Sequence, residues 1–143
     1  MINIKEMKSR ILASLEEAGC DRLTPLLNTV IDPQGDQSEV VIYEKALREL
    51  LLGDQIELGL TSIPFGNQPL SKDEALSELD KLVPNYRLVA GEKLWDDQRC
   101  SGPPFYQTPE PEAILTDIGR QSSEALLDER GFEWWRRPGM NAE

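Results

Sequence analysis

The sequence predicts an α+β fold with three N-terminal helices, a small antiparallel sheet and a C-terminal helix. Three observations lead to this fold class. Apolar residues recur at helical spacing in three segments before Gly53. At Gly53 the stretch 46–60 (ALRELLLGDQIELGL) changes from helical spacing to the alternation of a strand. A last helical pattern begins after Thr116 and ends at Gly131.

Capping residues and apolar spacing predict the first two helices. Residues 5–18 carry one apolar face, and Gly19 is expected to end that helix. Thr24 and Pro25 are typical of the N-cap and the first position of a short second helix, which closes at Pro33. The chain therefore begins with two helices joined by a short connection.

The third helix is expected to lead directly into a strand. Asp36 and Glu39 have the spacing of a capping box, and residues 40–51 place apolar side chains on one face. Gly53 is expected to adopt the left-handed conformation that commonly ends a helix. Residues 55–60 then alternate as a half-buried strand does.

The second half of the chain contains one clear helix start and one irregular region. Ser71 and Glu74 match a capping box, and the fourth helix is expected to end at Pro84. Alternation over residues 86–90 predicts a short strand. The proline-rich segment 91–112 is interpreted as a long irregular loop.

The domain organisation is predicted to be one domain over residues 1–143. The sequence contains no internal repeat and no low-complexity block, and its length suits a single core. The segment 61–112 is interpreted as an insertion, and residues 132–143 as a C-terminal tail.

Two stretches together resemble the winged helix-turn-helix superfamily. The first is the junction 46–60, which is similar to the end of that fold's third helix running into a strand. The second is 113–131 (AILTDIGRQSSEALLDERG), which is similar to the LT-x-x-G-R return from the wing into a C-terminal helix in many bacterial regulators. The resemblance implies that 61–112 elaborates the wing and that the third helix would enter the DNA major groove in DNA-binding members.

Charge disfavours a nucleic-acid partner. The net charge is −11, from 26 acidic and 15 basic residues, whereas binding to nucleic acid depends on lysine and arginine at phosphates. The positions of the third helix expected to face outward are Glu39, Glu44, Lys45, Arg48 and Glu49. Acids outnumber bases among them, which disfavours DNA binding by this helix. A DNA-binding dimer that uses Lys45, Arg48 and Arg120 is kept as an alternative, because two copies would bring two modest basic patches together.

Residue types predict that the protein is not an enzyme and has no cofactor or metal. The absence of histidine excludes histidine-based triads, and two distant cysteines exclude a four-ligand zinc site. Asp96 and Asp97 are expected in a solvated loop, and Asp73 is explained by a helix N-terminus. Cys20 is expected to be a structural cysteine; the alternative is a low-pKa thiol.

The aromatic and arginine tail is the candidate binding surface. Trp134, Trp135, Arg136 and Arg137 are of the types enriched at binding hot spots. In the alternative interpretation Phe132 and Trp134 cover the core while Trp135 lies half exposed.

The functional hypothesis is a regulatory or adaptor protein that binds a protein partner, with the segment 61–112 and the tail as contact surfaces. The alternatives are the DNA-binding dimer and an acidic inhibitor or immunity protein that imitates nucleic-acid charge. No apolar run reaches the roughly 18 residues that span a bilayer, so we expect no membrane partner and a cytoplasmic location. A homodimer is kept open.

Overall fold

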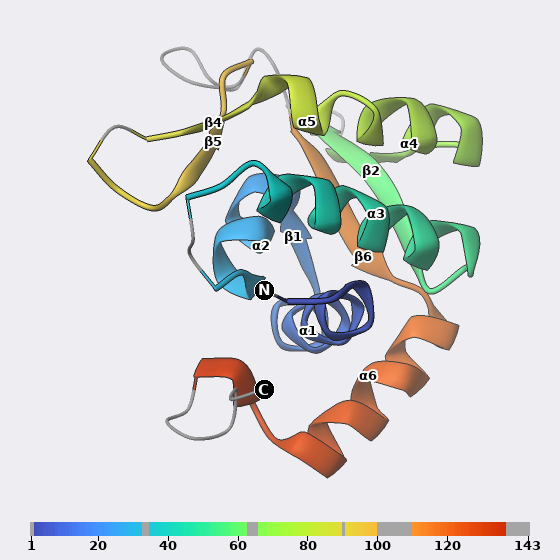
Figure 1. The fold of residues 1–143 in the computed structure, drawn as a ribbon. Coiled ribbons are helices and arrows are strands. Elements are labelled where there is room, and N and C mark those ends of the chain that lie inside the picture. The colour runs from blue at the N-terminus through green and yellow to red at the C-terminus, as the bar shows by residue number, and fades with distance from the viewer. Residues whose placement is uncertain (1, 33–34, 63–65, 90, 100–109, 137–143) are drawn as a thin grey trace.

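The computed structural model describes residues 2–32, 35–62, 66–89, 91–99 and 110–136, and it shows a mixed helix and sheet fold (Figure 1). The helices are α1 (Ile4–Ala18), α2 (Leu23–Val30), α3 (Ser38–Leu52), α4 (Lys72–Leu79), α5 (Leu82–Asn85), α6 (Asp117–Arg130) and the 3-10 turn η2 (Trp134–Arg136). Within the described ranges, no helix has the length and apolar character needed to cross a bilayer.

The strands form one four-stranded and one two-stranded sheet, both antiparallel. The larger sheet has the order β1-β6-β2-β3 and consists of β1 (Cys20–Arg22), β6 (Pro111–Leu115), β2 (Ile56–Ser62) and β3 (Gly66–Pro69). The smaller sheet pairs β4 (Tyr86–Leu88) with β5 (Trp95–Asp97). The predicted small antiparallel sheet is therefore confirmed, with β1, β3 and β5 as strands that the sequence pattern does not reveal.

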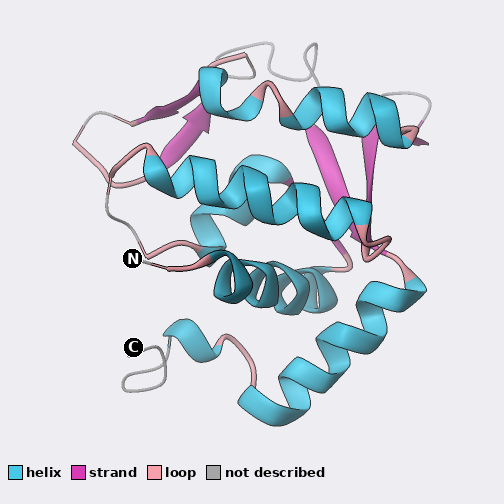
Figure 2. Ribbon diagram, turned by 45° about the vertical axis from the view of Figure 1, so that its right-hand side comes forward, coloured by secondary structure: helices cyan, strands magenta, loops and turns pink. Residues whose placement is uncertain are grey.

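One face of the larger sheet packs against the N-terminal helices. Ile56 lies opposite Leu115, and Leu58 lies opposite Ala113, and all four side chains are buried. Glu57, between Ile56 and Leu58, is directed to the other face and is exposed. Figures 1 and 2 show α1, α2 and α3 on the covered side, with α4 and α5 beside α3 and α6 beside α1.

The end of α3 differs from the prediction at its turn. Gly53 has a φ of −85°, and the left-handed residue is Asp54, with a φ of +59°. Aspartate tolerates this conformation better than most residues because its short side chain bonds locally. Gly53 N–H still donates to the carbonyl of Glu49 (2.9 Å), so the helix ends where expected but the turn occurs one residue later.

The start of α3 also differs from the prediction. Asp36 and Glu39 do not form a capping box, because Asp36 Oδ1 accepts from the backbone N–H of Ser38 (2.7 Å) and the Glu39 side chain is buried elsewhere. By contrast, the capping box of Ser71 and Glu74 is present at α4.

The segment after α4 is more regular than predicted. Helix α4 ends at Leu79, and Pro84 lies inside the short α5 instead of ending α4. Part of the predicted loop 91–112 is ordered as β5 and the start of β6. The alternation over residues 86–90 corresponds to β4, although residue 90 lies outside the described ranges.

The LT-x-x-G-R segment has a packing reason for its glycine. Thr116 caps α6 by accepting from the N–H of Gly119 (3.1 Å), as predicted. A Cβ added at Gly119 would lie 1.9 Å from the carbonyl oxygen of Gln55 and 3.0 Å from Leu115 Cδ2. The first turn of α6 therefore packs directly on the backbone that precedes β2.

This close approach predicts that Gly119→Ala destabilises the fold. In an open helix the change would favour folding by about 1 kcal/mol. Here the clash with backbone should reverse the sign and lower the free energy of unfolding by about 1–3 kcal/mol. Urea unfolding measures it, with Gln121→Ala on the exposed side of the same helix as control. A Gly119→Ala protein more stable than the wild type would contradict this packing.

Candidate functional site

The outward side of α3 is less acidic and less accessible than the sequence predicts. Glu39 does not face outward: it is 2% exposed, and its carboxylate accepts from Trp95 Nε1 (2.7 Å). Arg48 is paired with Glu44 and with Asp80 Oδ1 (2.6 Å). Lys45 is exposed and is not paired with Glu44 or Asp80. Of the two basic residues predicted to contact a partner from α3, it is therefore the more accessible.

The inserted helices lie beside α3 and are part of the core. Ala75 and Leu79 of α4 and Leu82 of α5 are at most 1% exposed. Gln37 Nε2 at the start of α3 donates to the carbonyl of Val83 (3.0 Å), and Arg48 in the second half of α3 pairs with Asp80, so the insertion contacts α3 at two points. Figure 2 shows α4 running alongside α3. Covering by α4 and α5 therefore restricts the side of α3 that a DNA groove would need.

The tail residues Trp134 and Trp135 belong to the core. They are 0% and 2% exposed, and their rings meet edge to face with centroids 4.9 Å apart. The expectation of a half-exposed Trp135 and a covered Phe132 is wrong, because Phe132 is 46% exposed. The two tryptophans are therefore not available as surface contacts in this conformation.

Of the two tail arginines, the structure describes only Arg136. Arg136 is exposed, and its guanidinium donates to the carbonyls of Asn28 (3.1 Å) and Thr29. Arg137 lies outside the described ranges. The Arg136 side chain thus fastens η2 to α2.

A polar network fastens the tail to α1. Glu6 accepts from Arg10, Arg130 (2.8 Å) and Trp134 Nε1 (2.8 Å). Burial pushes the pKa of Glu6 upward, but hydrogen bonds from these three side chains outweigh it and hold the pKa below its ordinary value. These hydrogen bonds attach the tail to α1, so the tail has a structural role in the fold.

One of the two aspartates expected in a solvated loop has a structural partner instead. Asp97 is fully buried, not solvated, and its carboxylate pairs with Arg99 (2.6 Å). Cys20 is exposed, which argues against a structural cysteine in the core. Partial desolvation of its thiol and the neighbouring Glu112 carboxylate raise the pKa of Cys20, which argues against a low-pKa thiol. Among the described residues no group of three or more cysteine, aspartate or glutamate side chains is arranged to hold a metal.

Glu110 is a buried carboxyl group near β1. It is 8% exposed and accepts from the backbone N–H of Thr24. Burial raises the pKa of Glu110 above 4.5, and the charge of Asp97 adds to this, while Thr24 and Arg22 oppose it. A carboxyl group with a raised folded pKa binds its proton more tightly in the folded state, so its ionisation weakens folding as pH rises.

We therefore expect Glu110→Gln to reduce the loss of stability with rising pH. The wild type should lose stability relative to the variant as pH rises from about 4.5 through the folded pKa of Glu110. Below that window the carboxyl group is protonated in both states, and the difference between the proteins should be constant. Urea unfolding of both proteins at several pH values tests this, and parallel profiles would contradict it.

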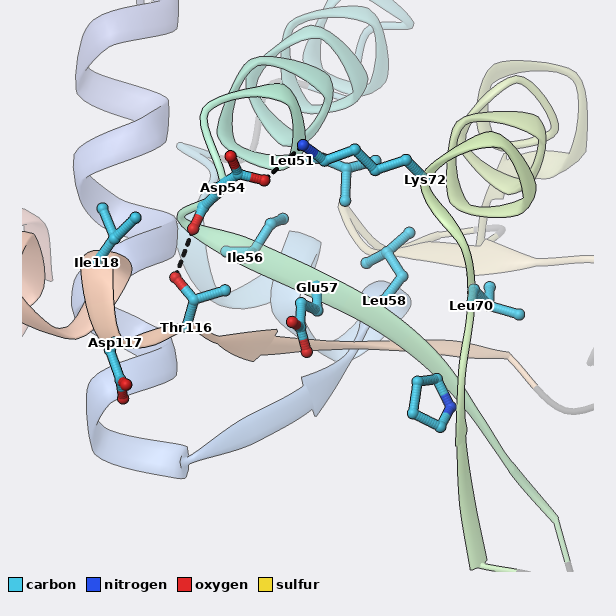
Figure 3. Close-up of a pocket in the computed structure, with 11 residues that line it drawn as sticks. Leu51, Asp54, Ile56, Glu57, Leu58, Leu70, Lys72, Thr116, Asp117 and Ile118 are labelled. Atoms are coloured by element: carbon cyan, nitrogen blue, oxygen red, sulfur yellow. Dashed lines mark hydrogen bonds and ion pairs between the residues drawn. The ribbon is translucent and has the colours of Figure 1, made fainter.

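A groove opens where α3 ends, beside β2 and the start of α6 (Figure 3). Its volume is about 670 Å³, within the range of about 300–1,000 Å³ for ligand sites. The apolar lining residues are Leu51, Ile56, Leu58, Pro69, Leu70 and Ile118. The polar lining residues are Asp54, Glu57, Lys72, Thr116 and Asp117. We call this feature the β2 groove.

The left-handed Asp54 ties three elements together at one end of the β2 groove. Its carboxylate pairs with Lys72 at the start of α4 (2.5 Å). Its carbonyl accepts from the hydroxyl of Thr116 (2.5 Å), the N-cap of α6. Figure 3 shows both interactions. The shape of the groove is therefore fixed by contacts between α3, α4 and α6.

The lining of the β2 groove lies on both sides of β2. Leu51, Ile56 and Leu58 lie on the α3 side and are at most 3% exposed. Glu57 is directed to the other side, and Ile118 at the start of α6 is 53% exposed. We call the exposed part of the lining, which includes Glu57 and Ile118, the rim.

No family model, curated protein or solved structure matches this chain. A function for this chain is therefore inferred from the arrangement of its own residues.

Sequence patterns did not identify the β2 groove. Ile118 belongs to the helical pattern that predicts α6, but it lies in the first turn after β6 ends and is 53% exposed. Glu57 is recognisable as the outward residue of an alternating strand. Its proximity to α6 depends on the pairing of β2 with β6, which the sequence does not reveal.

Proposed function

We propose that this chain is a non-enzymatic regulatory or adaptor protein that binds another protein through a winged-helix-like scaffold. Helices α1 to α3, the hairpin β2–β3 and, beyond α4, α5 and the β4–β5 pair, strand β6 and helix α6 follow one another in the order that the resemblance implies. This order supports the scaffold.

The covering of α3 is the observation that carries the proposal. A helix that reads DNA needs free cationic and amide side chains on its outer side. Arg48 is engaged by Glu44 and Asp80, and the α4–α5 insertion is anchored in the core beside it. With a net charge of −11, these contacts favour a protein partner over a duplex.

Affinity capture with the intact chain from nuclease-treated native cells tests the proposal. We expect a specific protein partner that binds the purified chain again when added back. The alternative of a DNA-binding dimer is tested by gel shift on the DNA upstream of the chain's own gene over a salt series. A salt-sensitive shifted band without any captured protein would overturn the proposal.

A further inference from the structure

Two carboxylates on the rim of the β2 groove have no ion-pair partner among the described residues. Glu57 and Asp117 are both exposed. Figure 3 shows their carboxylates directed to the same side of β2. The pair is therefore available to a cation from outside the chain.

The one lysine of the groove does not neutralise this pair. Lys72 is held by Asp54 at the α3 end, and Figure 3 shows it reaching over the opposite side of β2. The rim is thus negative beside Glu57 and Asp117. Such a rim repels phosphate groups and attracts lysine or arginine.

Two apolar side chains of the groove lining are also exposed. Ile118 follows Asp117 in the first turn of α6 and is 53% exposed, and Pro69 is exposed across the groove. An occupant that covers them needs apolar side chains as well as positive charge. Free metal ions and nucleic acids lack this combination, whereas a peptide segment can supply it.

We infer that the β2 groove binds a short segment of a partner protein that carries lysine or arginine beside apolar side chains. The charge of the rim selects the basic side chain, and Ile118 contacts the apolar one. This inference rests on the proposed function and identifies the surface and the partner chemistry through which it would act.

Amide NMR of the whole chain, titrated with a short synthetic peptide of lysine, leucine and alanine, tests the inference. We expect shift changes concentrated at the amides of residues 51–58, 70–72 and 116–118. A peptide with glutamate in place of lysine should not bind. Changes spread over the surface, or centred elsewhere, would overturn the inference.

Two double variants separate the groove from general charge attraction. E57Q/D117N and E124Q/D128N change the net charge equally, but Glu124 and Asp128 lie on the exposed side of α6 outside the groove. We expect E57Q/D117N to weaken peptide binding about tenfold, which corresponds to about 1.4 kcal/mol. E124Q/D128N should leave it within about twofold. Equal weakening by both would overturn the inference.

Two further measurements separate this inference from the proposed function. Ile118→Asp should abolish binding of the captured partner, with the fold checked by circular dichroism. A partner that binds Ile118→Asp as well as wild type would overturn the groove assignment and leave the adaptor function intact. Concentration-dependent self-association that perturbs the groove amides without peptide would also overturn it, because a second copy would then occupy the groove.

Discussion

Replacing Trp134 by alanine should lower the free energy of unfolding by about 3–5 kcal/mol, the range for truncating a buried aromatic side chain. Trp134 is fully buried and packs edge to face on Trp135. The change also removes its hydrogen bond to Glu6 and the stacking of Arg130, whose guanidinium lies 4.3 Å from the ring centroid. Urea unfolding followed by circular dichroism measures the loss.

Phe132→Ala is the matched control for Trp134→Ala. Phe132 belongs to the same tail but is 46% exposed. Its truncation should change stability by about 0.5 kcal/mol or less, as most surface changes do. Equal effects of the two substitutions would contradict the assignment of the tail as a core element and would reopen it as a contact surface.

Replacing Arg10 by alanine should destabilise the fold by about 3 kcal/mol, the lower end of the range for breaking a buried ion pair. Arg10 is 3% exposed and donates to the carbonyl of Val30 (3.0 Å) and to Asp32 (3.0 Å). It also lies over the ring of Trp135. The lower end applies because the Asp32 side chain is 39% exposed and regains water when Arg10 is removed.

Lys8→Ala on the same helix is the control for Arg10→Ala. Lys8 pairs with Glu49 (3.1 Å), and the two side chains are 31% and 51% exposed. An exposed pair of this kind contributes about 0–1 kcal/mol. If Lys8→Ala destabilised the fold as much as Arg10→Ala, the network of Arg10 would not be the anchor between α1, α2 and the tail.

Local patterns in the sequence predict the elements whose signals are local. The capping residues Ser71 and Thr116 and the stop at Gly131 are recovered where expected. Strand β1 could not be predicted, because Cys20–Arg22 is short and polar and is ordered only by pairing with β6. Strand β5 likewise depends on pairing with β4.

Side-chain roles were less predictable than elements because they depend on distant partners. The sequence places Glu39 on the outward side of a helix, but in the structure its carboxylate accepts a hydrogen bond from Trp95 of the insertion. Trp135 is buried, and the carbonyl of Thr29 accepts its indole N–H (3.0 Å). These contacts join residues far apart in the chain, and periodicity contains no information on them.

The β2 groove could not be predicted for the same reason. Its lining comes from α3, β2, β3, α4 and α6, and its edges are set by Asp54, whose conformation was expected at Gly53. Because the tryptophans of the tail are buried, we place the binding surface at this groove instead of at the tail. Glu57, Asp117 and Ile118 are exposed in the groove, and they are the residues through which we expect the chain to act.

Photo-crosslinking in the native cells tests this account most directly. The photoreactive amino acid p-benzoylphenylalanine would replace Ile118 in one variant and Glu124, outside the groove, in the other. The account predicts an adduct at position 118 that protease removes and nuclease leaves intact, and no such adduct at position 124. A nuclease-sensitive adduct at position 118, or equal adducts at both positions, would contradict it.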